Sequence, residues 1–154
     1  DHGMSPQKRY WHEVIGFNYR MTNLQAAIGM AQLKKLDKFV EKKRRIAGIY
    51  NQSLKDIEGL ELPPEMPWAK SVYWMYSILV TNNSRIDRTS LIEKLANSDI
   101  DSRPFFYPIH TMPPYIENVK YPTAEKLSQE GLNLPSSVKL SDDDIRRIIE
   151  VFHS

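Results

Sequence analysis

The pattern of apolar residues becomes helical at Asn23 and stays helical to about residue 56. Thr22 precedes it as a capping residue. Two apolar stripes follow at helical spacing: Leu24, Ala27, Ile28 and Ala31, and Ala26, Met30 and Leu33. A helix that is apolar over most of its circumference is usually packed between layers or subunits. We therefore expect a long spine helix over residues 23–56, with a restart or a bend at Asp37.

Beyond this helix the pattern becomes mixed. A linker with Gly59 and three prolines leads into SVYWMYSILV, residues 71–80, which is apolar on both alternating faces. That pattern predicts a strand at the centre of a covered sheet. Further elements are expected at residues 87–96 (helix), 100–106 (strand), 124–129 (helix) and 131–137 (extended).

The end of the chain carries a clear helix signal. Ser141 is a good N-cap, and Asp142, Asp143 and Asp144 place negative charge at the positive end of the helix dipole. Ile145, Ile148, Ile149 and Phe152 supply a buried stripe. The order of elements predicts a small α+β domain over residues 57–154, with the spine helix leading into it.

Composition narrows the function classes only slightly. The 154 residues carry a net charge of +2 and no cysteine, which excludes disulfides and cysteine-ligated metals. No apolar run reaches membrane-spanning length, so we expect a cytoplasmic protein without a membrane partner. The four histidines show no metal-ligand spacing, and no metal site is expected. Motifs for phosphate loops, dinucleotide folds and hydrolase elbows are also absent from the sequence.

Two stretches could carry chemistry. GFNYRMT, residues 16–22, places Asn18 and Arg20 immediately before a helix N-terminus, where backbone N–H groups favour an anion. These two side chains could bind a phosphate, or they could only hold the loop through bonds to backbone carbonyls. Both readings stay open on the residues alone.

The second stretch is RPFFYPIHTMPPY, residues 103–115, where prolines restrict the loop around His110. Such a loop could offer an aromatic wall and an imidazole to a sugar or a phosphate. Alternatively, it could pack its aromatic side chains on the core.

A basic run, KKLDKFVEKKRR, spans residues 34–45 and could contact nucleic acid. No aromatic stacking platforms are interleaved there, and a solvated helix face with a Glu41–Arg45 pair is the better explanation of the charges. We expect no nucleic-acid partner.

The same stretches resemble a known family. GFNYRMTNLQAAIGMAQLKKLD is similar to a hallmark of the DegT/StrS-type sugar aminotransferases, which use pyridoxal phosphate on the fold-type-I scaffold. DHGMSPQKRYWHEVIGFNYRMT looks like the stretch that follows the Schiff-base lysine in those enzymes. VYWMYSILV and RPFFYPIHTMPPY are similar to one branch, the GDP-perosamine synthases, which aminate GDP-4-keto-6-deoxymannose with glutamate as amino donor.

The resemblance implies roles for particular residues. Family enzymes are homodimers with active sites at the subunit interface, and the loop before the long helix helps to hold the cofactor phosphate of the neighbour. Asn18 and Arg20 take that role here. His110 matches a histidine that lines the sugar-nucleotide site. Further substrate contacts are assigned to the neighbours of that histidine: Arg103, Phe106 and Tyr107.

The resemblance also implies what the chain lacks. Residues 1–22 correspond to a loop remnant of the large cofactor domain, residues 23–56 to the spine and residues 57–154 to the small C-terminal domain. None of the lysines sits in the family's lysine motif, so no catalytic residue is assigned and we expect the chain alone to be inactive. The alternative is a non-catalytic binding or regulatory module that retains the fold.

Overall fold

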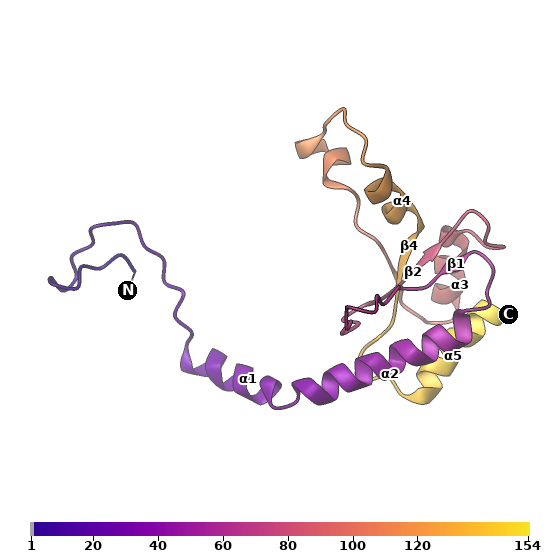
Figure 1. The fold of residues 1–154 in the computed structure, drawn as a ribbon, viewed down its shortest axis with the longest axis horizontal. Helices are drawn as coiled ribbons and strands as arrows, with labels where there is room; N and C mark the ends of the chain where they lie inside the picture. The colour runs from indigo at the N-terminus through magenta and orange to yellow at the C-terminus, as the bar shows by residue number, and fades with distance from the viewer. Residues whose placement is uncertain (1) are drawn as a thin grey trace. The chain divides into compact units, whose positions relative to one another are not determined.

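The structure, a computed structural model, describes residues 2–154 (Figure 1). The chain divides between residues 37 and 38 into two compact units. The first unit holds a loop and helix α1, Asn23–Leu33. The second unit holds most of helix α2, Leu36–Leu54, and all later elements. Each unit is described separately below.

The N-terminal loop closes on itself before α1 begins. Met4 and His12 form an isolated antiparallel bridge, and the Ser5 N–H donates to the Trp11 carbonyl over 2.7 Å. Gly3 and Gly16 allow the two arms of the loop to approach. A Cβ on Gly16 would lie 2.2 Å from the His2 carbonyl carbon, so no larger residue fits there.

Helix α1 starts where the sequence predicted, behind Thr22. The Thr22 side chain accepts from the Gln25 N–H, and the Gln25 side chain accepts from the Thr22 N–H in return. The helix then ends earlier than expected, because the Lys35 N–H donates to the Gln32 carbonyl and tightens the last turn. The single helix expected over residues 23–56 is thus two helices, divided at residues 34–35 rather than at Asp37.

The second unit is built on a four-stranded antiparallel sheet in the order β1-β2-β4-β3. The central pair aligns Tyr76 with Leu134 and Ile78 with Leu132. The bounds of the strands are Leu60–Glu61 (β1), Tyr76–Val80 (β2), Arg103–Pro104 (β3) and Gly131–Leu134 (β4). The remaining helices are α3 (Arg88–Asn97), α4 (Pro122–Glu130) and α5 (Asp142–His153), with 3-10 turns at Ile109–Thr111 and Pro113–Tyr115.

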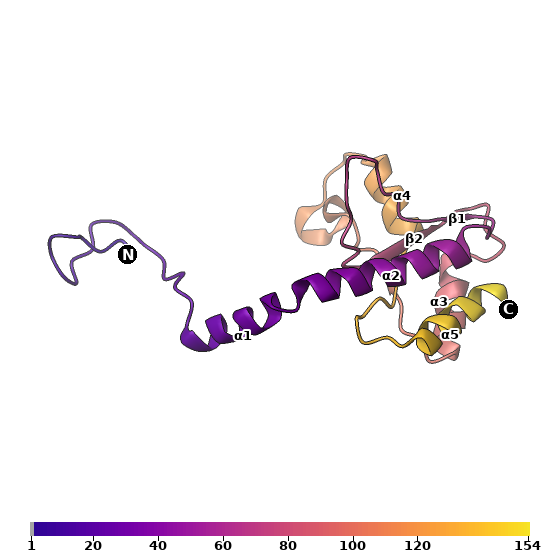
Figure 2. The same cartoon turned by 60° about the horizontal axis from the view of Figure 1, so that its bottom comes forward.

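Different helices pack on the two faces of the sheet. Alternation along β2 sends Tyr76, Ile78 and Val80 into a core shared with α2, α3 and α5. Ser77 points to the opposite face, which α4 covers only in part, and Figure 2 shows α4 across the sheet from α2 and α5. The second unit is therefore an α+β domain, and this confirms the predicted fold class.

Two strands are shorter than the sequence predicted. Of residues 71–80, only Tyr76–Val80 forms ladder pairs, because Tyr73 adopts φ +46° and the Trp74 carbonyl accepts from Lys43 Nζ over 2.7 Å instead of from a strand. The strand expected at 100–106 is reduced to Arg103–Pro104 by the proline. The C-terminal helix begins as predicted, with Ser141 and Asp144 forming a capping box.

Within residues 2–154, no helix is both long and apolar enough to cross a membrane. The same part of the chain contains no group of three or more His, Asp or Glu side chains placed to hold a metal ion.

A substitution at Gly131 tests the packing on the partly covered face of the sheet. A Cβ at this position would lie 2.3 Å from the Phe105 ring and 2.5 Å from the Leu127 carbonyl oxygen. Gly131→Ala should therefore destabilise the domain by about 1–3 kcal/mol, measured by urea unfolding. Gly48→Ala is the matched control, because a Cβ at this helical site meets nothing within 4 Å, and alanine should stabilise by about 0.5–1 kcal/mol. Equal effects at the two sites would contradict the packing described here.

Candidate functional site

The first candidate region is the loop before α1. Asn18 Oδ1 accepts from the Arg20 N–H over 3.1 Å, which closes a local turn and leaves the Asn18 side-chain amide N–H groups as donors. Asn18, Tyr19, Arg20, Met21 and Gln25 line an open depression of about 440 Å³. Arg20 is exposed and forms no ion pair within residues 2–154. The loop therefore offers a guanidinium and an amide beside a helix N-terminus.

Helix α1 keeps unused donors at that end. Its capping box satisfies the Gln25 N–H, and the Ala26 N–H donates to the Thr22 carbonyl. The N–H groups of Asn23 and Leu24 have no partner in the part of the chain that the structure describes. These N–H groups, like Arg20 a few residues before them, are donors suited to an anion.

The second candidate region is a pocket of about 500 Å³ on the partly covered face of the sheet. Ser77 of β2 and Asn133 of β4 belong to its floor, where the Ser77 hydroxyl donates to Asn133 Oδ1 over 2.7 Å. The walls come from the segment before β2, from β3 and the loop after it, and from α4: Trp74, Met75, Arg103, Pro104, Phe105, Phe106, Pro108, Ala124, Leu127 and Ser128.

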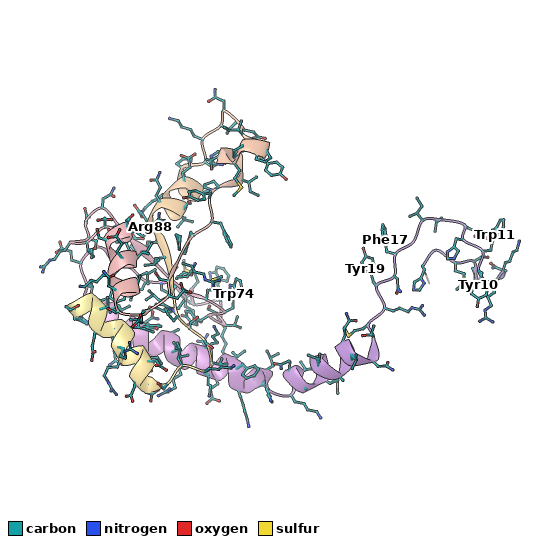
Figure 3. The ribbon with its side chains drawn as sticks, turned by 180° about the vertical axis from the view of Figure 1, so that it is seen from behind. Tyr10, Trp11, Phe17, Tyr19, Trp74 and Arg88 are labelled. Atoms are coloured by element: carbon teal, nitrogen blue, oxygen red, sulfur yellow. The ribbon has the colours of Figure 1, made fainter. Side chains whose placement is uncertain are left out.

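The walls combine aromatic surface with one cation. Trp74 is 73% exposed and Phe106 is 89% exposed, so both rings are open to a ligand (Figure 3 labels Trp74). Arg103 lies 3.6 Å from Asp101 in an exposed pair that would yield readily to a stronger anion. Such a site suits a flat ring that carries phosphate.

Of the four side chains predicted to contact substrate, the structure brings Arg103 and Phe106 into this pocket. Tyr107 is exposed and does not belong to the lining. His110 also lies outside the lining: its Nε2 is 3.1 Å from Glu125 Oε1, and its ring meets Tyr121 edge-on at 4.8 Å between centroids. In this structure His110 therefore ties the proline-rich loop to α4.

Sequence reasoning missed the side of the pocket formed by Trp74 and Met75, which it placed inside a regular strand. A network from α2 holds that segment in its irregular path. Lys43 Nζ bonds both the Trp74 carbonyl and Ser136 Oγ, and burial lowers the pKa of Lys43. Such long-range bonds leave no local pattern in the sequence.

Arg44 completes the network from the next position of α2. It pairs with Glu65 over 2.7 Å and also donates to the Ser71 carbonyl. The hydrogen bond from Arg44 holds the pKa of Glu65 below its ordinary value. A bulky residue seldom adopts a positive φ, so the conformation of Tyr73 could be predicted only from these contacts.

The basic run of residues 34–45 is largely used within the second unit. Besides Lys43 and Arg44, Lys42 Nζ reaches the Val138 carbonyl at 3.5 Å, and Arg45 makes a two-pronged pair with Asp142. The sequence suggested that Arg45 pairs with Glu41, but in the structure Arg45 pairs with Asp142. The sequence predicted a solvated helix face, whereas Lys42, Lys43, Arg44 and Arg45 bond other parts of the second unit.

The His110–Glu125 contact predicts a pH effect. The pKa of Glu125 lies below its ordinary value of 4.5, first because Glu125 accepts from the Tyr121 N–H and then because it bonds His110. A lowered carboxyl pKa contributes stability that is present above pH 4.5 and is lost as the pH falls through the folded-state value. Glu125→Gln should thus lower the melting temperature at pH 6, with the deficit shrinking towards pH 3. The exposed Glu117→Gln variant is the control, and a deficit independent of pH would contradict the lowered pKa of Glu125.

Comparisons with known proteins identify the relatives of this chain. The model of the DegT/DnrJ/EryC1/StrS aminotransferase family matches residues 1–153. GDP-perosamine synthase of Vibrio cholerae is 42% identical over 149 residues, which cover 95% of this chain and 40% of that protein. The chain thus spans about two fifths of the length of this curated relative.

Solved structures also resemble this chain in fold. The crystal structure of a DegT/DnrJ/EryC1/StrS aminotransferase from Brucella abortus matches with a TM-score of 0.84 at 30% identity, over 99% of this chain and 40% of that one. An Escherichia coli GDP-4-keto-6-deoxy-D-mannose-3-dehydratase with bound hydrated pyridoxal phosphate matches with a TM-score of 0.72 at 25% identity, over 93% of this chain and 38% of that one. Because the family model spans nearly every residue, the chain belongs to the DegT/DnrJ/EryC1/StrS aminotransferase family.

Proposed function

We propose that this chain is the C-terminal part of a pyridoxal-phosphate-dependent aminotransferase that aminates a 4-keto-6-deoxy sugar nucleotide. The proposed reaction is that of a GDP-perosamine synthase, with glutamate as amino donor, in the synthesis of deoxysugars for surface polysaccharide. The observation that carries the proposal is the match of the family model to residues 1–153, which include both candidate regions. The Vibrio cholerae relative supports the choice of sugar nucleotide.

The loop before α1 fits the phosphate of the cofactor. Arg20 offers a planar pair of donors, Asn18 offers amide donors, and the free N–H groups of Asn23 and Leu24 face the same end of the helix. When bound, pyridoxal phosphate supplies the electron sink that amino-group transfer requires. The role of this loop is to hold the phosphate and so to fix the orientation of the cofactor.

A homodimer fits the apolar surface of α1. None of its residues is buried by the residues that the structure describes, and its large apolar side chains are exposed: Leu24, Ile28, Met30 and Leu33. An apolar helix surface of this kind is normally buried against other protein. A second subunit as that cover would let the loop donate its phosphate contacts to the neighbouring active site.

The pocket on the sheet fits the nucleotide end of the substrate. The rings of Trp74 and Phe106 provide stacking surface for a base, and the Arg103 guanidinium provides a partner for the diphosphate. Tyr107, which lies outside the pocket lining, is proposed to contact substrate from the exposed loop next to Phe106. His110 acts as a positioning residue, because its bond to Glu125 fixes the loop that carries Phe106 and Tyr107.

The reaction can be tested in a chimera. Residues of this chain replace the matched segment of the Vibrio cholerae GDP-perosamine synthase, which supplies the remainder of a full-length enzyme. We expect the chimera to bind pyridoxal phosphate and to aminate GDP-4-keto-6-deoxymannose with glutamate, as measured by product chromatography. A folded, cofactor-loaded chimera that leaves this substrate unchanged but aminates another sugar nucleotide would overturn the assignment of substrate.

The phosphate contacts can be tested in the same chimera. Asn18→Ala and Arg20→Ala should each weaken cofactor retention by about tenfold, since each removes a hydrogen bond to a charged group. Arg20→Lys should fall between, because it keeps the charge and loses the planar fork. Retention is measured by the absorbance of the cofactor after dialysis, with exposed Lys38→Ala as control. Wild-type retention in both alanine variants would remove these residues from the site.

The stacking surface predicts a separate kinetic signature. Trp74→Ala and Phe106→Ala should raise KM for the sugar nucleotide about tenfold, because stacking of a base is worth about 1–3 kcal/mol. The kcat value and cofactor retention should stay near wild type, since neither ring is assigned to the cofactor. Tyr115→Ala serves as an exposed aromatic control in the adjoining loop. Unchanged KM in both pocket variants would exclude this pocket as the nucleotide site.

A further inference from the structure

The segment before β2 turns Trp74 away from the face that a regular strand would give it. Along β2, the side chains of Tyr76 and Ile78 are buried in the core, and side chains two positions apart share one face of a strand. A regular strand through residue 74 would therefore bury Trp74 on the core face. Instead residues 74 and 75 form a bend, and Trp74 is 73% exposed and lines the same pocket as Ser77, which faces away from the core. The aromatic wall of the pocket thus depends on a departure from strand geometry.

Lys43 occupies the point where the pairing of β2 with β4 stops. The ladder ends with Tyr76 opposite Leu134. Two positions further along, a longer ladder would place Trp74 opposite Ser136. Lys43 Nζ stands in for this missing pair, because it lies 2.7 Å from the Trp74 carbonyl oxygen and 3.1 Å from Ser136 Oγ. The ammonium group thus bridges the two chain segments where their direct hydrogen bonds end.

A second bond from α2 holds the same segment earlier in the chain. Arg44 donates to the Ser71 carbonyl and pairs with Glu65 over 2.7 Å, and Glu65 accepts from the Ser71 N–H. Tyr73 lies between the two bonded carbonyls, with its ring buried and its backbone at φ +46°. A bulky residue holds such a conformation only where its surroundings impose it. The two bonds from α2 are the restraints that flank it on either side.

Lys43 has no place in the pocket itself. It is half-buried and does not belong to the pocket lining, so its effect on a ligand passes through Trp74. Within residues 2–154 the Trp74 carbonyl accepts no other hydrogen bond. A hydrogen bond from a cation is roughly twice as strong as one between neutral groups. Loss of the ammonium group would therefore remove the main restraint on the residue that carries the ring.

We propose that Lys43 is the positioning residue that keeps the Trp74 ring in the nucleotide pocket. Without the ammonium group, the segment before β2 is free to change its path, and the ring spends less time where a base stacks on it. The inference rests on the proposed function, because it takes the occupant of the pocket to be the nucleotide of the substrate. It adds a residue of α2, on the core side of the sheet, to the determinants of nucleotide affinity.

Calorimetric titration of GDP into the full-length enzyme loaded with pyridoxal phosphate measures the effect. Lys43→Met keeps an apolar stem and removes the donors, so it should weaken GDP binding roughly three- to tenfold, up to the whole effect of losing the Trp74 ring. Lys42→Met is the matched control, because Lys42 Nζ reaches the Val138 carbonyl at 3.5 Å and not the Trp74 segment. Its GDP affinity should stay within about twofold of wild type. Equal GDP affinity in the two methionine variants would overturn the proposal.

Steady-state kinetics and a rescue variant separate positioning from a general loss of structure. In Lys43→Met, KM for the sugar nucleotide should rise by the same factor, while kcat and cofactor retention stay near wild type. Lys43→Arg keeps cationic donors and should bind GDP within about threefold of wild type. A fall in kcat and in cofactor retention alongside the rise in KM would indicate general damage to the fold and would contradict a positioning role.

A double-mutant cycle with Trp74→Ala gives the decisive result. If Lys43 acts through the ring, Lys43→Met should change GDP affinity by less than about twofold once the ring is absent. The same loss of affinity with and without the ring would show that Lys43 acts elsewhere, and the proposal would fail.

These measurements also separate the inference from the proposed function. Unchanged GDP affinity in Trp74→Ala would remove the nucleotide from this pocket, and the proposed site would fail together with the inference. Weaker GDP binding in Trp74→Ala, with wild-type affinity in Lys43→Met, would sink the inference alone. Hydrogen exchange of the backbone amides of residues 71–75, measured without ligand, should be faster in Lys43→Met than in Lys42→Met. Equal exchange rates in these two variants would show that Lys43 does not hold the segment.

Discussion

The contact between Tyr50 of α2 and Tyr76 of β2 is the interaction on which the small domain depends. The two rings lie 4.7 Å apart between centroids, and both side chains are completely buried. The Tyr50 hydroxyl donates to the Pro135 carbonyl and the Tyr76 hydroxyl to Asn51 Oδ1, so neither polar tip is left without a partner. Burial raises the pKa of both phenols, which keeps these donors protonated.

This contact decides which face of the sheet becomes core. Because β2 alternates, burial of Tyr76 against α2 turns Ser77 and its neighbour Asn133 towards the other face. That face is covered only by α4 and by the loop after β3, which leaves space for the pocket with Trp74 and Phe106. The domain thus packs three helices on one side of the sheet and leaves a pocket on the other.

The sequence predicted the parts that depend on local signals. Thr22 and Ser141 begin their helices with capping boxes, and the Asp87 carboxylate caps α3 by accepting from the Thr89 and Ser90 N–H groups. The α+β class followed from the order of these elements. The two-residue strand β1 was missed, since Leu60–Glu61 is too short to show a period and owes its conformation to pairing with β2.

The candidate site residues also divide into those with a local signal in the sequence and those placed by contacts of the fold. Asn18 and Arg20 stood out because an amide and a guanidinium precede a capped helix, and Arg103 and Phe106 stood out through the proline-rich loop. Trp74 was hidden because its place depends on Lys43, thirty-one positions earlier in the chain. His110 drew notice for its chemistry, whereas the structure ties it to Glu125, a partner that only the tertiary fold reveals.

The central proposal assigns a separate binding role to each unit of this chain: the loop before α1 binds a cofactor phosphate, and the pocket on the sheet binds a nucleotide. A crystal structure of the full-length protein with pyridoxal phosphate and GDP would test it most directly. The account predicts Asn18 and Arg20 within about 3 Å of the cofactor phosphate in the neighbouring subunit, and guanine against Trp74 and Phe106. Both side chains turned away from any cofactor, with GDP bound elsewhere, would contradict it.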